Sequence, residues 1–244
     1  MKEFEKQLEI VVPNAAELAA HDKEAFAKIR RAGLGASDSS IVLGVNHWTT
    51  DEQLIEQKCS DTLTAEEIEV GEKPQVRMGA DLEPIILQKF IERFDMEVHK
   101  PDPMYRLIRY PWLTVNFDGI LDETTPVECK LVSMFADKFW DKDKALADGS
   151  IIGKRVPLYG SATSIRDHVE TMAKLYGIPP YYYTQVQQQI LAANAASTYL
   201  AAMFLKDWTL RVYQIYRDQI TIDALVSRSK SIWETILLKK RDGR

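Results

Sequence analysis

The sequence has little of what marks several classes of protein. Its two cysteines, Cys59 and Cys129, are too few for a disulfide framework or a cluster held by four thiolates. No apolar run approaches the roughly 18 residues of a membrane span, because charged residues interrupt the longest ones. The first residues lack the apolar stretch of a secretion signal, and no low-complexity segment is present. We therefore expect a reduced, cytoplasmic protein with no membrane association.

Further absences limit the chemistry. Gly33-Leu34-Gly35 is not followed by the Gly-Lys-Ser/Thr of a phosphate-binding loop, so nothing supports ATP dependence. No Ser-His-Asp or Cys-His arrangement can be picked out, and Cys129 is expected to be a small core residue. The four histidines lack the spacing of metal ligands and are expected at surface or core positions: His21, His47, His99 and His168.

The overall composition fits one globular domain over residues 1–244. A chain of 244 residues with 45% hydrophobic residues can bury a sizeable core without disulfides or metals. The net charge of −5 argues against a uniformly basic nucleic-acid binder. It does not exclude nucleic acid, because the local field where phosphates sit matters more than the sum of charges.

Residue patterns in the first half predict helices followed by strands. Residues 1–30 are polar and alanine-rich and are expected to be helical, and a short helix is expected at 41–43. Residues 60–77 are charged and irregular, which favours a loop. A further helix is expected after Gly79, with Asp81 as its cap and Pro84 in its first turn. Its core-facing residues recur at helical spacing: Leu82, Ile86, Phe90 and Phe94.

The second half predicts an α/β fold. Segments 105–108, 112–117 and 127–132 are rich in β-branched and aromatic residues and predict strands, with turns at Asp118-Gly119 and Asp122-Glu123. Residues 133–180 read as a long insertion of mixed charge, in which Trp140 is a packing residue. The remaining expectations are a helix over 183–205, a strand over 209–216 and a closing helix over 222–240.

The strand over 127–132 carries the chemically informative residues. Its period of two places Glu128 and Lys130 on the same face, and Asp118 precedes the strand. Phosphodiester hydrolysis needs a nucleophile and relief of negative charge, and divalent metal ions supply both. Mg²⁺ prefers oxygen ligands, which Asp118, Glu128 and the Cys129 backbone carbonyl could provide. Lys130 could orient water or stabilise charge, and Glu83 is a candidate further carboxylate.

Simpler explanations compete with each of these assignments. An Asp followed by Glu-x-Lys occurs by chance in many acidic proteins, where such a strand face is merely exposed to solvent. Glu83 could be only a favourable carboxylate at a helix N-terminus, and Ser37 could merely cap a helix. Arg30 or Arg31 could belong to a surface ion pair of little consequence. The residues alone therefore leave the nuclease hypothesis open.

The same residues fit the PD-(D/E)xK nuclease pattern, and their surroundings resemble the lambda-exonuclease, or YqaJ-type, viral recombinase nucleases. Asp118-Gly119 and Glu128-x-Lys130 resemble that family's central motifs, although Asn116-Phe117 stands where the family usually has Ser-Pro. Three flanking blocks resemble the family in order, within residues 30–205: the Arg, Gly-rich and Ser-Asp block at 30–38, the G-x-x-x-E block at 79–83, and the Y-x-x-Q-V-Q block that begins at Tyr183.

The resemblance implies a restriction-endonuclease-like core, with a central mixed β-sheet flanked by helices. It implies a metal-dependent 5′→3′ exonuclease that digests one strand of linear duplex DNA, with Mg²⁺ or Mn²⁺ as its cofactor. Relatives often form closed ring-shaped homo-oligomers and pass the exposed 3′ single strand to an annealing protein. Carried over by position, the roles fall on the following residues: Asp118, Glu128 and Glu83 at the metal, Lys130 and Gln185 at the catalytic centre, and Arg30, Ser37 and, more weakly, Asn116 at the 5′-phosphate.

Two alternatives remain at this stage. A related nuclease could differ in polarity or strand preference. Relatives of the CRISPR-associated type usually carry an iron–sulfur cluster on four cysteines, which the two cysteines of this sequence cannot supply. A non-catalytic DNA-end-binding scaffold could keep the fold without the activity. It would have no physical need for Asp118, Glu128 and Lys130 together. The sequence does not decide the oligomeric state, the metal preference or the choice between Arg30 and Arg31.

Overall fold

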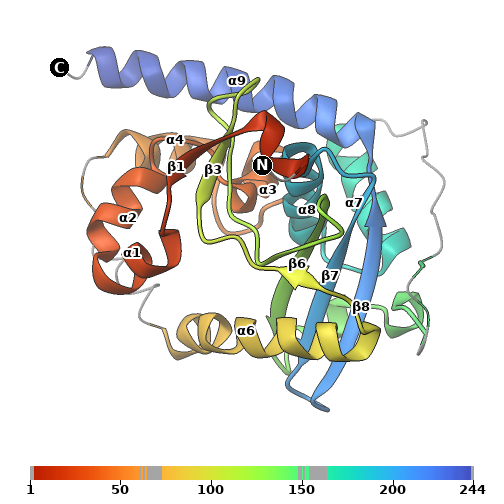
Figure 1. Ribbon diagram of the computed structural model, residues 1–244. Coiled ribbons are helices and arrows are strands. Elements are labelled where there is room, and N and C mark those ends of the chain that lie inside the picture. Colours follow the sequence, from red (N-terminus) through yellow and green to blue (C-terminus); the bar gives the residue numbers. More distant parts are fainter. Residues whose placement is uncertain are drawn as a thin grey trace.

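Two β-sheets organise the protein. The computed structural model describes residues 3–60, 62, 64, 73–147, 150, 152–153 and 164–242 (Figure 1). The larger sheet has the strand order β2-β5-β6-β7-β8 and the smaller one the order β1-β3-β4. Strands β6 and β7 are parallel and all other neighbours in the larger sheet are antiparallel, which confirms the expected central mixed sheet. The strands are β1 (Leu8–Val12), β2 (Val98–His99), β3 (Met104–Leu107), β4 (Thr114–Val115), β5 (Gly119–Leu121), β6 (Thr125–Val132), β7 (Ser197–Phe204) and β8 (Thr209–Tyr216).

Helices cover both faces of the larger sheet. On β7, Tyr199 and Ala201 pack on one face with Phe90 of α6 (Pro74–Phe94). Alternate residues such as Leu200 pack on the other face, in the larger core that holds α7 (Ile165–Tyr176) and α8 (Pro180–Ala193). The long helix α9 (Gln219–Asp242) runs across the top of Figure 1, and α6 lies at the bottom. Because helices pack on both faces of the sheet, its strand β7 is buried on both sides.

Local sequence sets where several helices begin and end. Thr50 and Gln53 form a reciprocal capping box at the start of α4 (Asp51–Cys59). Ser164 caps α7, which ends at Gly177 with φ +72°, a left-handed conformation that suits glycine. Shorter helices complete the described chain: η1 (Glu3–Gln7), α1 (Ala15–His21), α2 (Lys23–Arg30), η2 (Ala36–Asp38), α3 (Ser39–Val42), η3 (Asp137–Phe139) and η4 (Lys142–Lys144).

The helix expected over 183–205 is wrong in its second half. Helix α8 ends at Ala193, Asn194 follows in the left-handed conformation, and residues 197–204 form β7. Every residue of β7 is buried, so its apolar run carries no alternation that would distinguish a strand from a buried helix. The closing predictions are confirmed, because β8 spans 209–216 and α9 covers 222–240.

Other boundaries also differ from expectation. Helix α6 begins at Pro74, which takes the first helical position, so Gly79, Asp81 and Pro84 lie inside the helix rather than at its start. The expected helical stretch of residues 1–30 includes β1, and the expected turn at Asp118-Gly119 is instead the entry to β5. Most of the loop expected over 60–77 lies outside the described residues.

The segment 133–180 contributes to the main core. Its helix α7 buries Val169, Met172 and Ala173 completely. Trp140 is 7% exposed and packs edge-on against Phe204, as expected of a packing residue. Parts of this segment, 148–149, 151 and 154–163, lie outside the described residues. The described remainder is therefore built into the fold rather than appended to it.

Candidate active site

Strand β6 presents the Glu-x-Lys pair toward α8. Glu128 and Lys130 alternate with Val127 and Cys129, which are buried against α6 on the opposite face. This confirms the two faces that the sequence predicts for the strand. Cys129 is 5% exposed and is a core residue, as expected.

Asp118 joins the pair because β5 follows it directly. The last register pair of the two strands is Gly119 with Val127, so Asp118 lies beside the next residues of β6. Its Oδ2 accepts a hydrogen bond from the Cys129 backbone N–H at 2.7 Å. A side chain at Gly119 would place a Cβ 2.6 Å from Cγ1 of Val98, so any larger residue would displace the packing of β5 on its neighbours.

The same geometry places the Cys129 carbonyl. In a strand, the N–H and C=O of one residue point to the same side. The Cys129 N–H points past the end of β5 toward Asp118, so its carbonyl also lies on that side. A backbone oxygen and a carboxylate therefore face the same space beyond the paired part of β5.

Glu128 is held by donors from two elements. It is 2% exposed, and its Oε1 accepts hydrogen bonds from Gln185 Nε2 and Lys130 Nζ. Its Oε2 accepts a hydrogen bond from Gln189 Nε2. Sequence reasoning gave Gln189 no role, although its spacing of four residues from Gln185 places both amides on one face of α8. That spacing was the signal available in the sequence.

Burial distinguishes Arg30 from Arg31. Arg30 is exposed, and its Nη2 donates a hydrogen bond to Ser37 Oγ at 3.3 Å. Arg31 is 6% exposed and its Nη1 donates to the backbone carbonyl of Ser60 at 3.1 Å. Arg30 is therefore open to the surface, whereas Arg31 is enclosed by the fold.

One cavity of about 230 Å³ brings most of the predicted residues together. It is lined by seven of them: Arg30, Ser37, Asn116, Asp118, Glu128, Lys130 and Gln185. Glu83, in the middle of α6, does not line it: its carboxylate accepts a hydrogen bond from Lys100 Nζ at 3.1 Å, although it is near enough to act on the charge of Asp118. Within the described ranges, no three His, Cys, Asp or Glu side chains are close enough to hold a metal ion together. The expected third carboxylate is thus outside the cavity in this conformation.

The electrostatics of the cavity favour a cationic ligand near Asp118. Burial and the nearby charges of Glu128 and Glu83 raise the pKa of the Asp118 carboxyl well above its usual range. Burial alone would lower the pKa of Lys130, but the charges of Glu128 and Asp118 raise it on balance, so Lys130 is protonated at neutral pH. Carboxylates that repel one another are the expected environment of a divalent cation.

Comparison with known proteins places the chain in a family. Residues 25–196 match the model of the YqaJ-like viral recombinase domain. The chain is 30% identical over 116 residues to the uncharacterized protein YqaJ of Bacillus subtilis (strain 168), an alignment that covers 47% of this chain and 35% of that protein. The chain thus spans about a third of that relative's length.

Solved structures support the same fold. The crystal structure of LHK-Exo in complex with dAMP matches with a TM-score of 0.61 and 14% identity, over 90% of this chain and 94% of that one. The structure of the alkaline exonuclease LHK-Exo from Laribacter hongkongensis matches with a TM-score of 0.58 and 14% identity, over 87% and 91%. No helix in the described ranges could cross a bilayer. Because the family model covers well over half of its length, this chain belongs to the family of YqaJ-like viral recombinase domains.

Proposed function

We propose that the protein is a metal-dependent exodeoxyribonuclease that degrades linear duplex DNA from its 5′ ends and exposes 3′ single strands for phage or prophage recombination. The observation that carries this proposal is the shared cavity. Asp118, Glu128 and Lys130 meet there with Arg30 and Ser37, so candidate catalytic and 5′-phosphate groups lie in one space of about 230 Å³.

The donor set fits Mg²⁺, with Mn²⁺ as the alternative. Asp118, Glu128 and the Cys129 carbonyl offer only oxygen atoms, which hard divalent cations prefer. Burial and the neighbouring charges of Glu128 and Glu83 raise the pKa of Asp118, and this supports a cation as the further partner of its carboxylate. When bound there, the ion would activate water and neutralise charge on the phosphate. Glu83 is the candidate for a further carboxylate and would first have to leave Lys100.

The chain's own side chains have separate tasks in this proposal. Lys130 carries the positive charge that stabilises the developing negative charge on the phosphoryl oxygens. Gln185 and Gln189 hold the two oxygens of Glu128 and fix the orientation of its carboxylate. Arg30 and Ser37 bind the terminal 5′-phosphate, because a guanidinium fork matches phosphate oxygens. Asn116 remains a weaker candidate for the same phosphate.

Two alternatives have different consequences. A nuclease of other polarity would use the same metal-binding carboxylates but would not depend on Arg30. A DNA-end-binding scaffold would bind duplex ends without cleaving them. The scaffold is disfavoured because burying Asp118 beside Glu128 is costly for a protein that has no use for a cation.

Release of nucleotides from 5′-phosphorylated linear duplex, with and without Mg²⁺, separates these functions. We expect metal-dependent release that disappears in Asp118→Ala and Lys130→Ala, because these variants lose a metal ligand or the catalytic ammonium. Arg109→Ala, which changes an arginine outside the cavity, is the matched control and should retain activity. Duplex binding without release would favour the scaffold instead.

Comparing 5′-phosphate with 5′-hydroxyl ends tests the polarity. We expect Arg30→Ala to lose the preference for phosphate, whereas equal rates on both ends in the parent protein would remove the Arg30 assignment. We further propose a ring-shaped homo-oligomer that works with a single-strand annealing protein in the cytoplasm of the bacterial host. Sedimentation measurements would give the number of subunits.

A further inference from the structure

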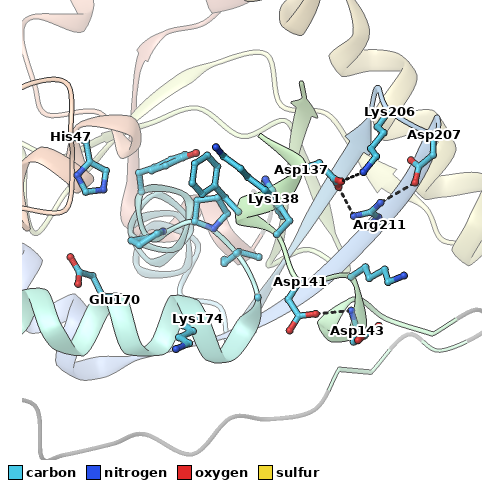
Figure 2. A pocket seen from close by; sticks show the side chains of 18 of the residues that line it. His47, Asp137, Lys138, Asp141, Asp143, Glu170, Lys174, Lys206, Asp207 and Arg211 are labelled. Atoms are coloured by element: carbon cyan, nitrogen blue, oxygen red, sulfur yellow. Dashed lines mark hydrogen bonds and ion pairs between the residues drawn. The ribbon is translucent and has the colours of Figure 1, made fainter. Parts of the chain in front are cut away.

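A larger cavity lies at the N-terminal end of α8, beyond the candidate active site. Its volume is about 920 Å³, and Figure 2 shows His47, Glu170 and Lys174 along one part of it and Asp137 and Arg211 in another. Neither the family match nor the proposed hydrolysis gives this cavity a role. Part of its wall comes from residues 137–143, within the segment 133–180 that the sequence marks as an insertion.

Aromatic rings connect this cavity to the candidate active site. Lys130 Nζ lies 5.4 Å from the centroid of the Tyr182 ring. The Tyr182 and Tyr181 rings are 4.5 Å apart, and the Trp48 ring is 5.2 Å from Tyr181. Trp48 is 69% exposed, so the row ends in a ring available to a ligand, and Phe139, which also lines the cavity, is 59% exposed. Exposed aromatic rings next to a nuclease centre are typical stacking surfaces for unpaired bases.

One face of α8 sets the order of the sites. Gln188 donates to the backbone carbonyl of Leu34, at the start of the loop that carries Ser37. Gln185, one turn earlier, contacts Glu128, and Tyr181, one further turn back, lines the larger cavity. At a rise of about 1.5 Å per residue, these steps of three and four residues are about 4.5 Å and about 6 Å along the helix. A strand whose 5′-phosphate binds at Arg30 therefore crosses Glu128 and continues toward Tyr181.

The charges of the cavity favour stacking over phosphate binding as the source of affinity. Asp137 pairs with Lys206 and Arg211, and Arg211 also pairs with Asp207. Glu170 pairs with Arg166. Among the described residues, five further charged side chains of the wall form no ion pair: Lys138, Lys142, Lys174, Asp141 and Asp143. Three positive charges against two negative ones leave the cavity with little net charge.

We propose that this cavity binds unpaired DNA bases immediately 3′ of the scissile phosphate, with Trp48 and Tyr181 as the stacking surface. This inference rests on the proposed nuclease function for the direction of the strand. The ligand is single-stranded DNA rather than duplex, because a base must leave its pair to place its face on an exposed indole ring.

Fluorescence anisotropy in EDTA, which prevents metal-dependent cleavage, tests the proposal. The probes are a 5′-phosphorylated duplex with blunt ends and the same duplex with a short 5′ single-stranded tail. We expect Trp48→Ala to weaken binding of the tailed probe about tenfold and of the blunt probe by about twofold or less, and Trp48→Phe to restore it. The loss should be similar at low and high salt, because stacking releases few counterions. Trp208→Asn is the control, since Trp208 is also 69% exposed, does not line the cavity and has a φ of +55° that Asn tolerates.

Three results would overturn the proposal. Equal losses on both probes would indicate a duplex contact, no loss on either would indicate a surface for a protein partner, and an equal loss in Trp208→Asn would remove the assignment to this cavity. Nuclease activity is measured separately with Mg²⁺. If the parent protein is active and Trp48→Ala binds the tailed probe as the parent does, base binding in the cavity is refuted and the proposed function stands. Tail binding that depends on Trp48 in an inactive parent protein would refute the proposed function alone.

Discussion

We expect the Asp118 carboxylate to make the metal-free protein less stable above acidic pH. Because its pKa in the folded state is raised, the folded protein holds the proton more tightly than the unfolded chain. Stability is therefore lost as pH rises from the ordinary Asp value near 4 through the folded value. We expect Asp118→Asn to raise the melting temperature in EDTA at about pH 8, where each 1 kcal/mol corresponds to about 2–4 °C. The gain should vanish near pH 4.

The response to metal gives this prediction its control. If Mg²⁺ binds the folded state as proposed, it should raise the melting temperature of the parent protein and raise that of Asp118→Asn much less. Asp223→Asn, an exposed change on α9, should leave both the pH dependence and the metal response unchanged. A lower melting temperature for Asp118→Asn in EDTA would contradict the electrostatic argument.

For single residues, the sequence predicts positions that follow from the alternation of a strand, but it does not predict contacts between residues far apart in the chain. The period of two places Glu128 and Lys130 together, because a strand leaves no other choice. Gln189 could not be assigned, because its contact with Glu128 depends on how α8 packs on β6. Glu83 was placed near a helix start, but α6 begins at Pro74, so Glu83 lies in the helix interior and pairs with Lys100.

The loop between α2 and α3 is positioned by a buried lysine on α4. Lys58 is 5% exposed, its Nζ lies 2.7 Å from Asp38 Oδ2, and it donates to the Arg30 backbone carbonyl at 3.1 Å. The Asp38 carboxylate also accepts a hydrogen bond from the Gly35 N–H. Lys58 therefore fixes both ends of the loop that carries Arg30 and Ser37, without lining the cavity itself.

We expect Lys58→Met to reduce the preference for 5′-phosphate over 5′-hydroxyl ends, because the loop is no longer held at both ends. Breaking a buried pair also leaves Asp38 uncompensated, at a cost of about 3–5 kcal/mol in the free energy of unfolding. The double change Lys58→Met with Asp38→Asn should recover much of that stability while the end preference stays low. The readout is the ratio of initial rates on the two ends.

Glu56→Gln, an exposed change on the same helix, is the matched control for Lys58. It should keep both the stability and the end preference of the parent protein. If the stable double variant discriminates between ends as the parent does, Lys58 has only a structural role.

At the scale of elements, helical periodicity was informative only where one face is exposed. The stripe of Ile86 and Phe90 on α6 is confirmed, because the opposite face of that helix meets solvent. The run 197–204 misled because a central strand has no exposed face, so apolar residues fall at helical and strand spacings alike. The end of α8 at Asn194 is a typical left-handed cap, and this residue was the available signal.

The whole molecule is joined by a buried polar network around Asp218. This carboxylate is fully buried and contacts His168 Nε2 on α7 at 2.7 Å and the Tyr183 hydroxyl on α8 at 2.8 Å. It also accepts a hydrogen bond from Thr221 Oγ1 at 2.6 Å in the first turn of α9. One side chain thus links three helices, including α7 from the segment 133–180, which the sequence marks only as an insertion.

The Asp218 network predicts how the stability of the whole molecule depends on pH. Burial alone would raise the pKa of Asp218, but hydrogen bonds from Thr221, His168 and Tyr183 lower it on balance. Because the folded-state pKa is lowered, the stabilisation is present above the ordinary Asp value near 4 and is lost as pH falls through the folded value. We expect Asp218→Asn to lower the free energy of unfolding by about 3 kcal/mol at neutral pH, measured by urea denaturation.

The difference between Asp218→Asn and the parent protein should shrink as the pH falls below about 4, because the parent then loses the same charge. Asp223→Asn changes an exposed carboxylate that accepts a hydrogen bond from Gln219 along α9, and it should cost little at any pH. The cavity lined by Glu128 and Lys130 does not include Asp218, so nuclease activity per folded molecule should be preserved. A loss of activity without a loss of stability would show that the network acts on the site through α8 rather than on the fold, since Tyr183 is two residues from Gln185 on that helix.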